Sequence, residues 1–358
     1  MTFNDVLEIK NGRNQKAVEN PNGKYPIYGS GGIMGYADDY ICDAQTVIVG
    51  RKGSINSPLF VEEPFWNVDT AFGLCADRKI LEPRYLFYFC KKFDFERLNK
   101  AVTIPSLTKS DLLKIEIQLP TLEEQKYIVE KLLKIEQLID LRKRELYELN
   151  NLIKSRFVEL FGTENEFGKW PCCTIGDVAD VCVGVVIKPT QYYTDNGIPA
   201  FRSLNIGEMR VKDSDWVYFT EEGHEKNQKS VIRKNDVLVV RSGAPGTACV
   251  ATEKYDGYNA VDIIIAHPDN SKVNSIFLAA FTNMPHGMNQ IRAKTSGAAQ
   301  QHFNVGGYKA MNLIMPPIEL QNQFAAFVEQ TDKSKVKVQK SLHEIQQLMD
   351  SLMQKYFG

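Results

Sequence analysis

An internal repeat is the feature of this chain that most constrains its fold. The segment Pro120-Thr-Leu-Glu-Glu-Gln125 recurs as Pro316-Pro-Ile-Glu-Leu-Gln321, and Pro120 and Pro316 are 196 residues apart. The same interval of 196 residues joins Leu146 to Leu342, Glu148 to Glu344, Leu152 to Leu348, Ser155 to Ser351 and Phe161-Gly162 to Phe357-Gly358. A match held at one interval over this distance indicates two copies of one structural unit.

The match continues upstream at smaller intervals, as expected where surface loops differ in length. Asp69 corresponds to Asp262 at 193 residues, Arg51-Lys-Gly53 to Arg241-Ser-Gly243 at 190, and Thr2-Phe-Asn-Asp5 to Thr174-Ile-Gly-Asp177 at 172. The second copy has a lead-in, Gly168-Lys-Trp-Pro171, whereas the first begins almost directly at Thr2. Each half is therefore expected to be a globular domain followed by one helix.

Length and composition agree with a soluble protein of two or three domains. The 358 residues exceed what one hydrophobic core ordinarily serves, and 43% hydrophobic with 24% charged residues is an ordinary globular composition. No apolar run reaches the ~18 residues of a membrane helix, and Met1 to Asp5 do not begin a secretory signal. We expect a cytoplasmic protein. The seven cysteines form no C-x-x-C pair, which predicts reduced and mostly buried thiols.

The globular domains have the pattern of mixed α/β structure. Short β-branched runs at Thr46–Val49, Val237–Val240 and Ile263–Ile265 alternate with glycine-rich turns, and Arg84–Lys92 has helical character. The predicted order is a first globular domain at residues 1–120, a central helical region at 121–162, a second globular domain at 163–317 and a distal helical region at 318–358.

The helical regions are predicted to be long and to pack against each other. Thr121 and Glu124 have the spacing of a capping box, directly after Pro120. Steps of four and three residues then give an apolar seam that Arg142 and Arg156 interrupt. The seam is Ile128, Leu132, Ile135, Ile139, Leu146, Leu149, Ile153 and Leu160 in the first helix, and Phe324, Val328, Val338, Leu342, Ile345, Met349 and Leu352 in the second.

The expected fold class is thus α+β. It comprises two similar mixed α/β domains, each followed by a long α-helix, with the helices packed as an antiparallel coiled coil of pseudo-two-fold symmetry. The second seam is weaker at Thr331 and Lys335, but its period continues to Tyr356. The alternative is that each helix docks on its own globular domain. A seam this long and narrow favours a helix partner.

Two related domains held by a rod suit the measurement of two half-sites on DNA. The net charge of −1 excludes binding by bulk charge but allows a local basic face. Residues 84–114 contain seven basic and three acidic side chains, a net +4, and residues 280–310 contain three basic and no acidic ones, a net +3. Both copies therefore carry positive charge in the same part of the repeat, where it can bind phosphates.

Candidate DNA contacts are loop residues that can bond base edges, and the basic residues beside them. In the first copy they are Ser30, Gly31, Arg51, Lys52, Ser54, Lys91, Lys92, Thr103, Ser106 and Lys109. In the second they are Arg202, Ser203, Asn205, Arg241, Ser242, Arg292, Lys294, Gln300, Gln301 and His302. For any one of them the alternative is an ordinary solvated loop position.

Motifs of catalysis are missing from the sequence. It has no G-x-x-x-x-G-K-[ST] loop for nucleotide phosphates and no Asn-Pro-Pro-Tyr signature of adenine methylation, and Pro268-Asp269 lacks the acidic residue and lysine of a nuclease site. The histidines, at positions 224, 267, 286, 302 and 343, lack metal-ligand spacing. We therefore expect a non-catalytic protein without a metal or cofactor of its own.

The chain resembles the specificity subunits of type I restriction-modification enzymes. The resemblance lies in Pro120-x-Leu-Glu-x-Gln125-x-x-Ile128 and its repeat from Pro316 to Phe324, in the endings Ser155 to Gly162 and Ser351 to Gly358, and in Tyr25 to Gly32 and Ile104 to Leu107. It covers the whole chain in the order domain, helix, domain, helix.

This resemblance implies a function and partners. Subunits of this family bind two methyltransferase subunits through the conserved helices, each recognition domain reads one half of a split, asymmetric site in double-stranded DNA, and the helix length sets the spacer. The complex methylates adenine, and with motor-nuclease subunits it also restricts unmodified DNA. S-adenosylmethionine, ATP and magnesium belong to the partners. Two rivals are a specificity module split from a fused modification enzyme and a coiled-coil scaffold that does not bind DNA.

Overall fold

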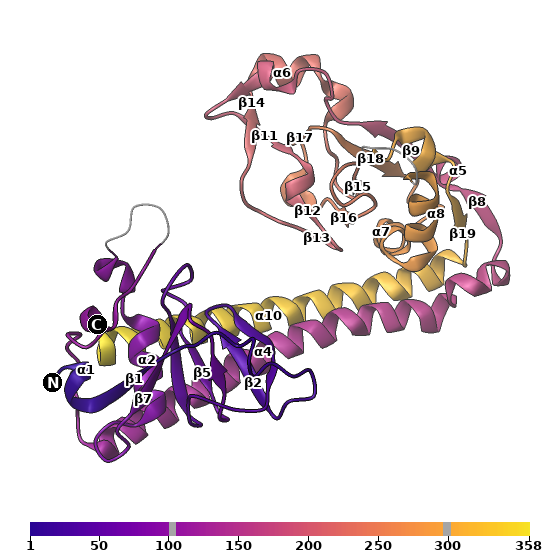
Figure 1. Ribbon diagram of the computed structural model, residues 1–358. Helices are drawn as coiled ribbons and strands as arrows, with labels where there is room; N and C mark the ends of the chain where they lie inside the picture. Colours follow the sequence, from indigo (N-terminus) through magenta and orange to yellow (C-terminus); the bar gives the residue numbers. More distant parts are fainter. Residues whose placement is uncertain (100–104, 296–301) are drawn as a thin grey trace. The chain divides into compact units, whose positions relative to one another are not determined.

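The protein divides into two compact units that share two long helices (Figure 1). The structure, a computed structural model, describes residues 1–99, 105–295 and 302–358. Unit 1 comprises Met1–Arg144 with Gln339–Gly358, and unit 2 comprises Glu145–Val338. The long helices are α4 (Leu122–Phe161) and α10 (Ile318–Phe357), and each contributes one part to each unit.

The described residues of unit 1 form two sheets, three α-helices and one 3₁₀ helix besides its parts of α4 and α10. Its antiparallel four-stranded sheet has the order β1-β7-β4-β5, and a second sheet has the order β3-β2-β6, in which β2 and β6 are parallel. The elements are α1 (Phe3–Val6), β1 (Leu7–Asn11), β2 (Tyr25–Gly29), β3 (Gly32–Ala37), β4 (Thr46–Gly50), β5 (Leu59–Val61), β6 (Trp66–Asn67), β7 (Ala71–Ala76), α2 (Pro83–Lys92), the 3₁₀ helix η1 (Phe95–Leu98) and α3 (Lys109–Leu112).

Unit 2 contains the same two kinds of sheet with additional short elements. The antiparallel sheet has the order β16-β15-β18-β9, and the sheet β10-β14-β11-β17 contains the parallel pair β11 and β17. The strands are β8 (Cys172–Thr174), β9 (Ala179–Val183), β10 (Tyr193–Thr194), β11 (Ile198–Phe201), β12 (Ile206–Gly207), β13 (Arg210–Val211), β14 (Val217–Phe219), β15 (Val237–Val240), β16 (Ala248–Val250), β17 (Asn259–Ala260), β18 (Ile263–Pro268) and β19 (Asn312–Ile314). The helices are η2 (Glu164–Lys169), α5 (Ile175–Val178), η3 (Pro189–Tyr192), η4 (Ser203–Asn205), α6 (Glu221–Lys226), η5 (Gln228–Ser230), η6 (Glu253–Tyr255), α7 (Ser275–Asn283), α8 (Pro285–Thr295) and α9 (Val305–Lys309).

The two units have equivalent connectivity, as the repeat predicted. Strands β1, β7, β4 and β5 correspond to β9, β18, β15 and β16, and the antiparallel β2–β3 pair with its parallel neighbour β6 corresponds to β11, β14 and β17. Each copy also starts on the same capping box, Thr2 with Asp5 and Thr174 with Asp177. The two units differ before the first helix of each copy. Thr2 forms an isolated bridge with Glu116, whereas unit 2 has the paired strands β8 and β19 at the equivalent place.

Helix α4 begins at the predicted capping box and ends before a glycine. The backbone amide and the hydroxyl of Thr121 both donate to the Glu124 carboxylate, at 2.9 and 2.7 Å, and the amide of Glu124 donates back to the hydroxyl at 3.3 Å. After Phe161, Gly162 has a φ of +90°, and its amide donates to the Val158 carbonyl at 2.8 Å. Glycine is the residue that tolerates this backbone conformation, so the repeated Phe-Gly pair marks a helix end.

All ten seam positions in each long helix are buried or half-buried. In unit 1, Ile128 and Leu132 of α4 share a core with Met353, near the end of α10. In unit 2, Ile153, near the end of α4, shares a core with Phe324 at the start of α10. The helices are therefore antiparallel within each unit, and Figure 1 shows the yellow end of α10 beside the start of α4.

Each long helix also packs on a globular domain, which was the alternative to the coiled coil, because the same cores contain residues of the globular domains. Ile128 and Leu132 pack with Phe3, Leu86 and Phe89 of unit 1. The long helices thus pack on the globular cores as well as on each other.

The repeated glutamine of the Pro-x-x-Glu-x-Gln motif fastens each long helix to its globular domain. The Gln125 side chain is fully buried: its amide nitrogen donates to the carbonyls of Ile80 and Pro120, both at 3.0 Å, and its oxygen accepts from the amide of Glu82 at 2.9 Å. Gln321 repeats this pattern, donating to the Pro316 carbonyl and accepting from the amide of Asn274. The motif therefore positions α2 and α7 against the long helices.

Replacing Gln125 with leucine is expected to lower the free energy of unfolding by about 2–4 kcal/mol, because three buried backbone groups lose their partner. The measurement is chemical denaturation followed by circular dichroism. Gln137→Leu, at an exposed position of the same helix, is the control and should change stability by less than about 0.5 kcal/mol. Equal stability of the two variants would contradict the assigned role.

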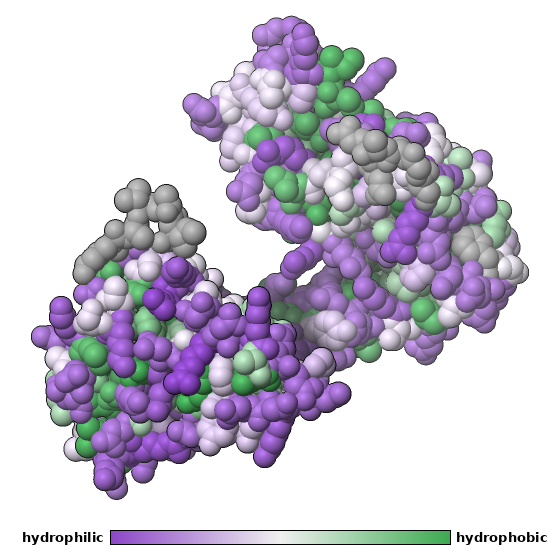
Figure 2. Space-filling model, in the orientation of Figure 1, coloured by the Kyte–Doolittle hydropathy of each residue, from purple (hydrophilic) through white to green (hydrophobic). Residues whose placement is uncertain are grey.

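The described surface of unit 1 is mostly hydrophilic, with small apolar patches, on the face that Figure 2 shows. None of the helices in the described part of the chain has the length and apolar character needed to cross a bilayer. Of the seven cysteines, Cys42, Cys90 and Cys249 are buried, Cys172 is exposed and the others are half-buried. Fewer thiols are buried than the sequence led us to expect.

Candidate nucleic-acid interface

Unit 1 brings together polar residues from three separate loops. Strand β4 ends at Gly50. A side chain at this position would collide with the Ser54 carbonyl and lie 3.1 Å from the Ser30 Cβ. The turn between β2 and β3, which contains Ser30, therefore lies against the loop that follows β4. Lys52 forms an isolated bridge with Ser106, and the amide of Gly53 donates to the Pro105 carbonyl at 3.1 Å. Of the predicted residues, this arrangement gathers Ser30, Gly31, Arg51, Lys52, Ser54 and Ser106; Thr103 lies outside the described residues.

The basic side chains of this loop face solvent. Arg51, Lys52 and Ser54 are all exposed. One Arg51 nitrogen lies 3.5 Å from the Asp69 carbonyl, and its guanidinium lies 5.8 Å from the centre of the Phe72 ring. These contacts orient Arg51, which has no acidic partner among the described residues, so its charge remains available to an anion such as a phosphate.

The net charge of +4 counted along residues 84–114 overstates the free positive charge there. Lys91 Nζ pairs with Glu136 of α4 at 3.1 Å, and Arg84 pairs with Glu62. Both acidic partners lie outside the counted window, which is why sequence counting missed them. Lys109 Nζ donates to the Ile9 carbonyl at 2.8 Å, whereas Lys92 is exposed.

Unit 2 builds an equivalent cluster after β15. The Arg241 guanidinium pairs with Asp262 at 2.5 Å and donates to the Phe303 carbonyl at 3.2 Å. The Ser242 hydroxyl lies 2.7 Å from His302 Nδ1, and His302 is exposed. Arg241, Ser242 and His302 are thus brought together, while Gln300 and Gln301 lie outside the described residues.

The predicted group Arg202, Ser203 and Asn205 divides into different roles. Asn205 is fully buried, and its side chain accepts from the amide of Arg202 at 2.9 Å and donates to the Ser214 carbonyl at 2.7 Å. Its assignment as a base contact is wrong in this conformation, because its amide closes a turn. Arg202 and Ser203 are half-buried, and Arg202 donates to the Asp215 carbonyl.

The basic residues of α8 have different bonding partners from those of the Arg241 group. Lys294 Nζ donates to the Gly307 carbonyl at 2.8 Å, and partial burial lowers the pKa of its ammonium group. Arg292 is exposed on the same helix. Lys309 of α9 lies 3.9 Å from Asp180, so here too a basic residue of the counted window has an acidic neighbour outside it.

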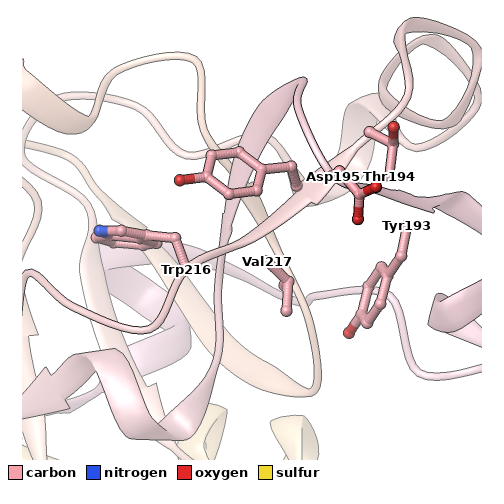
Figure 3. A pocket seen from close by; sticks show the side chains of 6 residues that line it. Tyr193, Thr194, Asp195, Trp216 and Val217 are labelled. Carbon is pink, nitrogen blue, oxygen red and sulfur yellow. The ribbon is translucent and has the colours of Figure 1, made fainter.

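A hollow of about 380 Å³ in unit 2 is lined by Tyr193, Thr194, Asp195, Trp216, Val217 and Tyr218. Figure 3 shows Trp216 and Tyr193 on opposite sides of Val217. Arg202 belongs to this neighbourhood, because it bonds the residue before Trp216 and its charge lowers the pKa of Tyr193, although burial raises that pKa more strongly. Aromatic faces beside an arginine can stack unpaired bases. The pair Tyr192-Tyr193 was a visible signal that sequence reasoning did not use.

Comparison with known proteins agrees with this geometry. The family model described as the type I restriction modification DNA specificity domain matches residues 1–151 and 168–348. The chain is 23% identical over 337 residues to the specificity subunit of the type I restriction enzyme StySPI from Salmonella potsdam, covering 86% of this chain and 72% of that one. It is 23% identical over 371 residues to the EcoBI specificity subunit from Escherichia coli, covering 94% and 77%.

Solved structures show the same fold. The S subunit of a type I restriction-modification system from M. genitalium matches with a TM-score of 0.63 at 18% identity, covering 100% of this chain and 95% of that one. A chain from a second type I restriction-modification system matches with a TM-score of 0.61 at 17% identity, covering 100% and 96%. The resemblance in the repeated motifs is thereby confirmed, and this chain belongs to the family of type I restriction-modification DNA specificity domains.

Proposed function

We propose that this chain is the DNA sequence-specificity subunit of a type I restriction-modification complex. Its recognition domains, residues 1–120 and 163–317, each read one half of a bipartite, asymmetric site in double-stranded DNA. The helical regions 121–162 and 318–358 set the spacer. The observation that carries the proposal is that both units place a basic and hydroxyl-bearing loop at the same point of the fold, the end of β4 or β15, against the segment that precedes α3 or α9.

The residues in these loops suit two tasks in DNA recognition. Arg51 and Lys52 are exposed cations that can bind backbone phosphates and fix the register of the domain on the duplex. Ser54, Ser106, Ser242 and His302 carry hydroxyl or imidazole groups that can bond base edges in a groove. In unit 2 the Arg241–Asp262 pair is half-buried and positions the loop, so Ser242 and His302 are the better candidates for base contact there.

The long helices supply a surface for partner subunits. On α4, Tyr127, Leu138 and Leu141 are exposed, and at 100° per residue they fall on one face, away from the seam. A row of exposed apolar side chains suits a protein partner. We propose that this face docks a methyltransferase subunit, with two such subunits and, through them, motor-nuclease subunits in the full complex. S-adenosylmethionine, ATP and magnesium are then bound by the partners.

The test of the function is single-molecule sequencing of adenine methylation in host DNA, with this gene present and then deleted. The expected result is that one split motif loses methylation on deletion, which also identifies the target sequence. Retention of every methylated motif would count against the proposal and favour the coiled-coil scaffold. Loss of a continuous, unsplit motif would count against the two-half-site reading.

Changing Leu138 and Leu141 together to aspartate is expected to abolish co-purification of the methyltransferase subunit, because the partner would bury two unpaired charges. The measurement is pull-down of co-expressed subunits followed by size-exclusion chromatography. Tyr147→Asp, an exposed aromatic position on a different face of α4, is the matched control and should leave the complex intact. Loss of the complex in the control but not in the double variant would place the docking face elsewhere.

A further inference from the structure

Unit 2 contains a cysteine, a histidine and an aspartate in line. Cys182 Sγ of β9 lies 3.7 Å from His267 Nε2, and His267 Nδ1 of β18 lies 2.7 Å from the Asp236 carboxylate, just before β15. Cys182 also donates to the Lys229 carbonyl at 3.2 Å. None of the three residues belongs to the candidate DNA loops, so the proposed function leaves this cluster unexplained.

Strand register places the three side chains on one face of the sheet. Cys182 is paired with Ile265 of β18, and Ile265 is paired with Leu238 of β15. Side chains two residues apart along a strand point to the same face, so His267 and Asp236 accompany Ile265 and Leu238. The alignment is therefore fixed by the sheet and does not depend on a loop.

Solvent exposure increases along the cluster from Asp236 to the other two residues. Asp236 is 2% exposed, and its second carboxylate oxygen accepts from the amide of Arg233 at 2.6 Å. His267 and Cys182 are half-buried, which leaves the sulfur at the accessible end. A nucleophile, a base within reach of it and a third group that orients the base is the arrangement that activates thiols in proteins.

The charges around His267 favour its acceptance of a proton. The hydrogen bond that His267 donates to the Asp236 carboxylate, and then its hydrogen bond with Cys182, raise the pKa of His267 to about 9, so the ring is positively charged at pH 7. Asp180, the cross-strand partner of His267, is exposed and lies 3.9 Å from Lys309. Lys229 of η5 contributes its carbonyl to Cys182, and its side chain is exposed.

The first copy of the repeat lacks this cluster. At the interval of 172 residues, Cys182 corresponds to Lys10, which pairs with Glu8 at 3.1 Å. A cluster present in only one copy is not required by the shared fold.

We propose that Cys182 is a modification site that reacts with low-molecular-weight disulfides, with the His267 imidazolium as the cation that stabilises the Cys182 thiolate and Asp236 as the residue that holds His267. Cys182 loses its proton to solvent beside the His267 imidazolium, and the Sγ thiolate attacks one sulfur of the disulfide RSSR. The S–S bond breaks, and the departing thiolate takes a proton from solvent. The products are a mixed disulfide on Cys182 and one RSH, so the protein sulfur is oxidised while one sulfur of the reagent is reduced.

The test is incubation of the full chain with oxidised glutathione at pH 7, followed by peptide mass spectrometry of all seven cysteines. Cys182 is expected to form its mixed disulfide about tenfold faster than Cys172, although Cys172 is the more exposed. The rate at Cys182 should fall about tenfold in His267→Gln, with the rate at Cys172 unchanged. His343→Gln, at an exposed position of α10, is the matched control and should leave both rates unchanged.

Buried Cys249 reports whether a variant is folded, because it becomes modified only when unit 2 opens. If His267→Gln exposes Cys249, Asp236→Asn serves as the second variant, and in the unaltered chain the ratio of the Cys182 rate to the Cys172 rate should rise as the pH falls from about 8 to about 6.5. The proposal is overturned if Cys182 reacts no faster than Cys172 in the unaltered chain, or if a folded His267→Gln variant keeps the full rate.

Discussion

Replacing Phe157 with alanine is expected to destabilise unit 2 by about 3–5 kcal/mol, a large part of the stability of an ordinary domain. The Phe157 ring is fully buried. Its centre lies 4.9 Å from that of Phe161, 5.8 Å from Phe277 and 5.5 Å from Phe324. It therefore joins α4, α7 and α10, and truncation would leave a cavity where three helices meet.

The measurement is thermal unfolding, with hydrogen exchange of backbone amides to locate the change. Faster exchange is expected in α7 and in the first turns of α10. Tyr147→Ala, an exposed position on the same helix, is the matched control and should shift stability by less than about 0.5 kcal/mol. A Phe157→Ala variant with the exchange pattern of the control would show that this aromatic cluster does not hold the helices.

Phe157 also shows where sequence reasoning on the helices succeeded and where it stopped. Steps of four and three residues identified Ile153 and Leu160, and both are withdrawn from solvent. The positions that these steps select do not include Phe157 and Phe161, yet both side chains are fully buried. A single partner helix covers a narrow stripe, whereas α4 here packs on α10 and on a globular core together, so its buried face is wider.

The candidate interface was predictable in part for a similar reason. The repeat interval correctly matched Arg51 with Arg241, since each directly follows the equivalent strand of its sheet. Sequence spacing could not show that Asp262 takes up the charge of Arg241, nor that Glu136 takes up that of Lys91. Partners of this kind are brought together by tertiary folding, so their pairing cannot be counted along the chain. The burial of Asn205 has the same origin, because its turn closes on Ser214.

Basic side chains with no acidic partner in the described part of the chain are therefore the positions where DNA affinity should be most sensitive to substitution. Changing Arg51 and Lys52 together to alanine is expected to weaken binding about tenfold at ~0.1 M salt and to reduce the slope of log affinity against log salt by about 2, one phosphate contact for each lost cation. The measurement is a fluorescence-anisotropy titration of duplex DNA with the assembled methyltransferase complex at several salt concentrations.

The matched control is Lys143→Ala with Arg144→Ala, which also removes one lysine and one arginine from adjacent exposed positions but leaves the loop after β4 intact. If bulk charge drove binding, both double variants would lose the same affinity and the same salt slope. A selective loss in the Arg51 and Lys52 variant would instead assign the phosphate contacts to that loop. An unchanged slope in both variants would remove the loop from the interface, since contacts with phosphates cannot be lost without a change in counterion release.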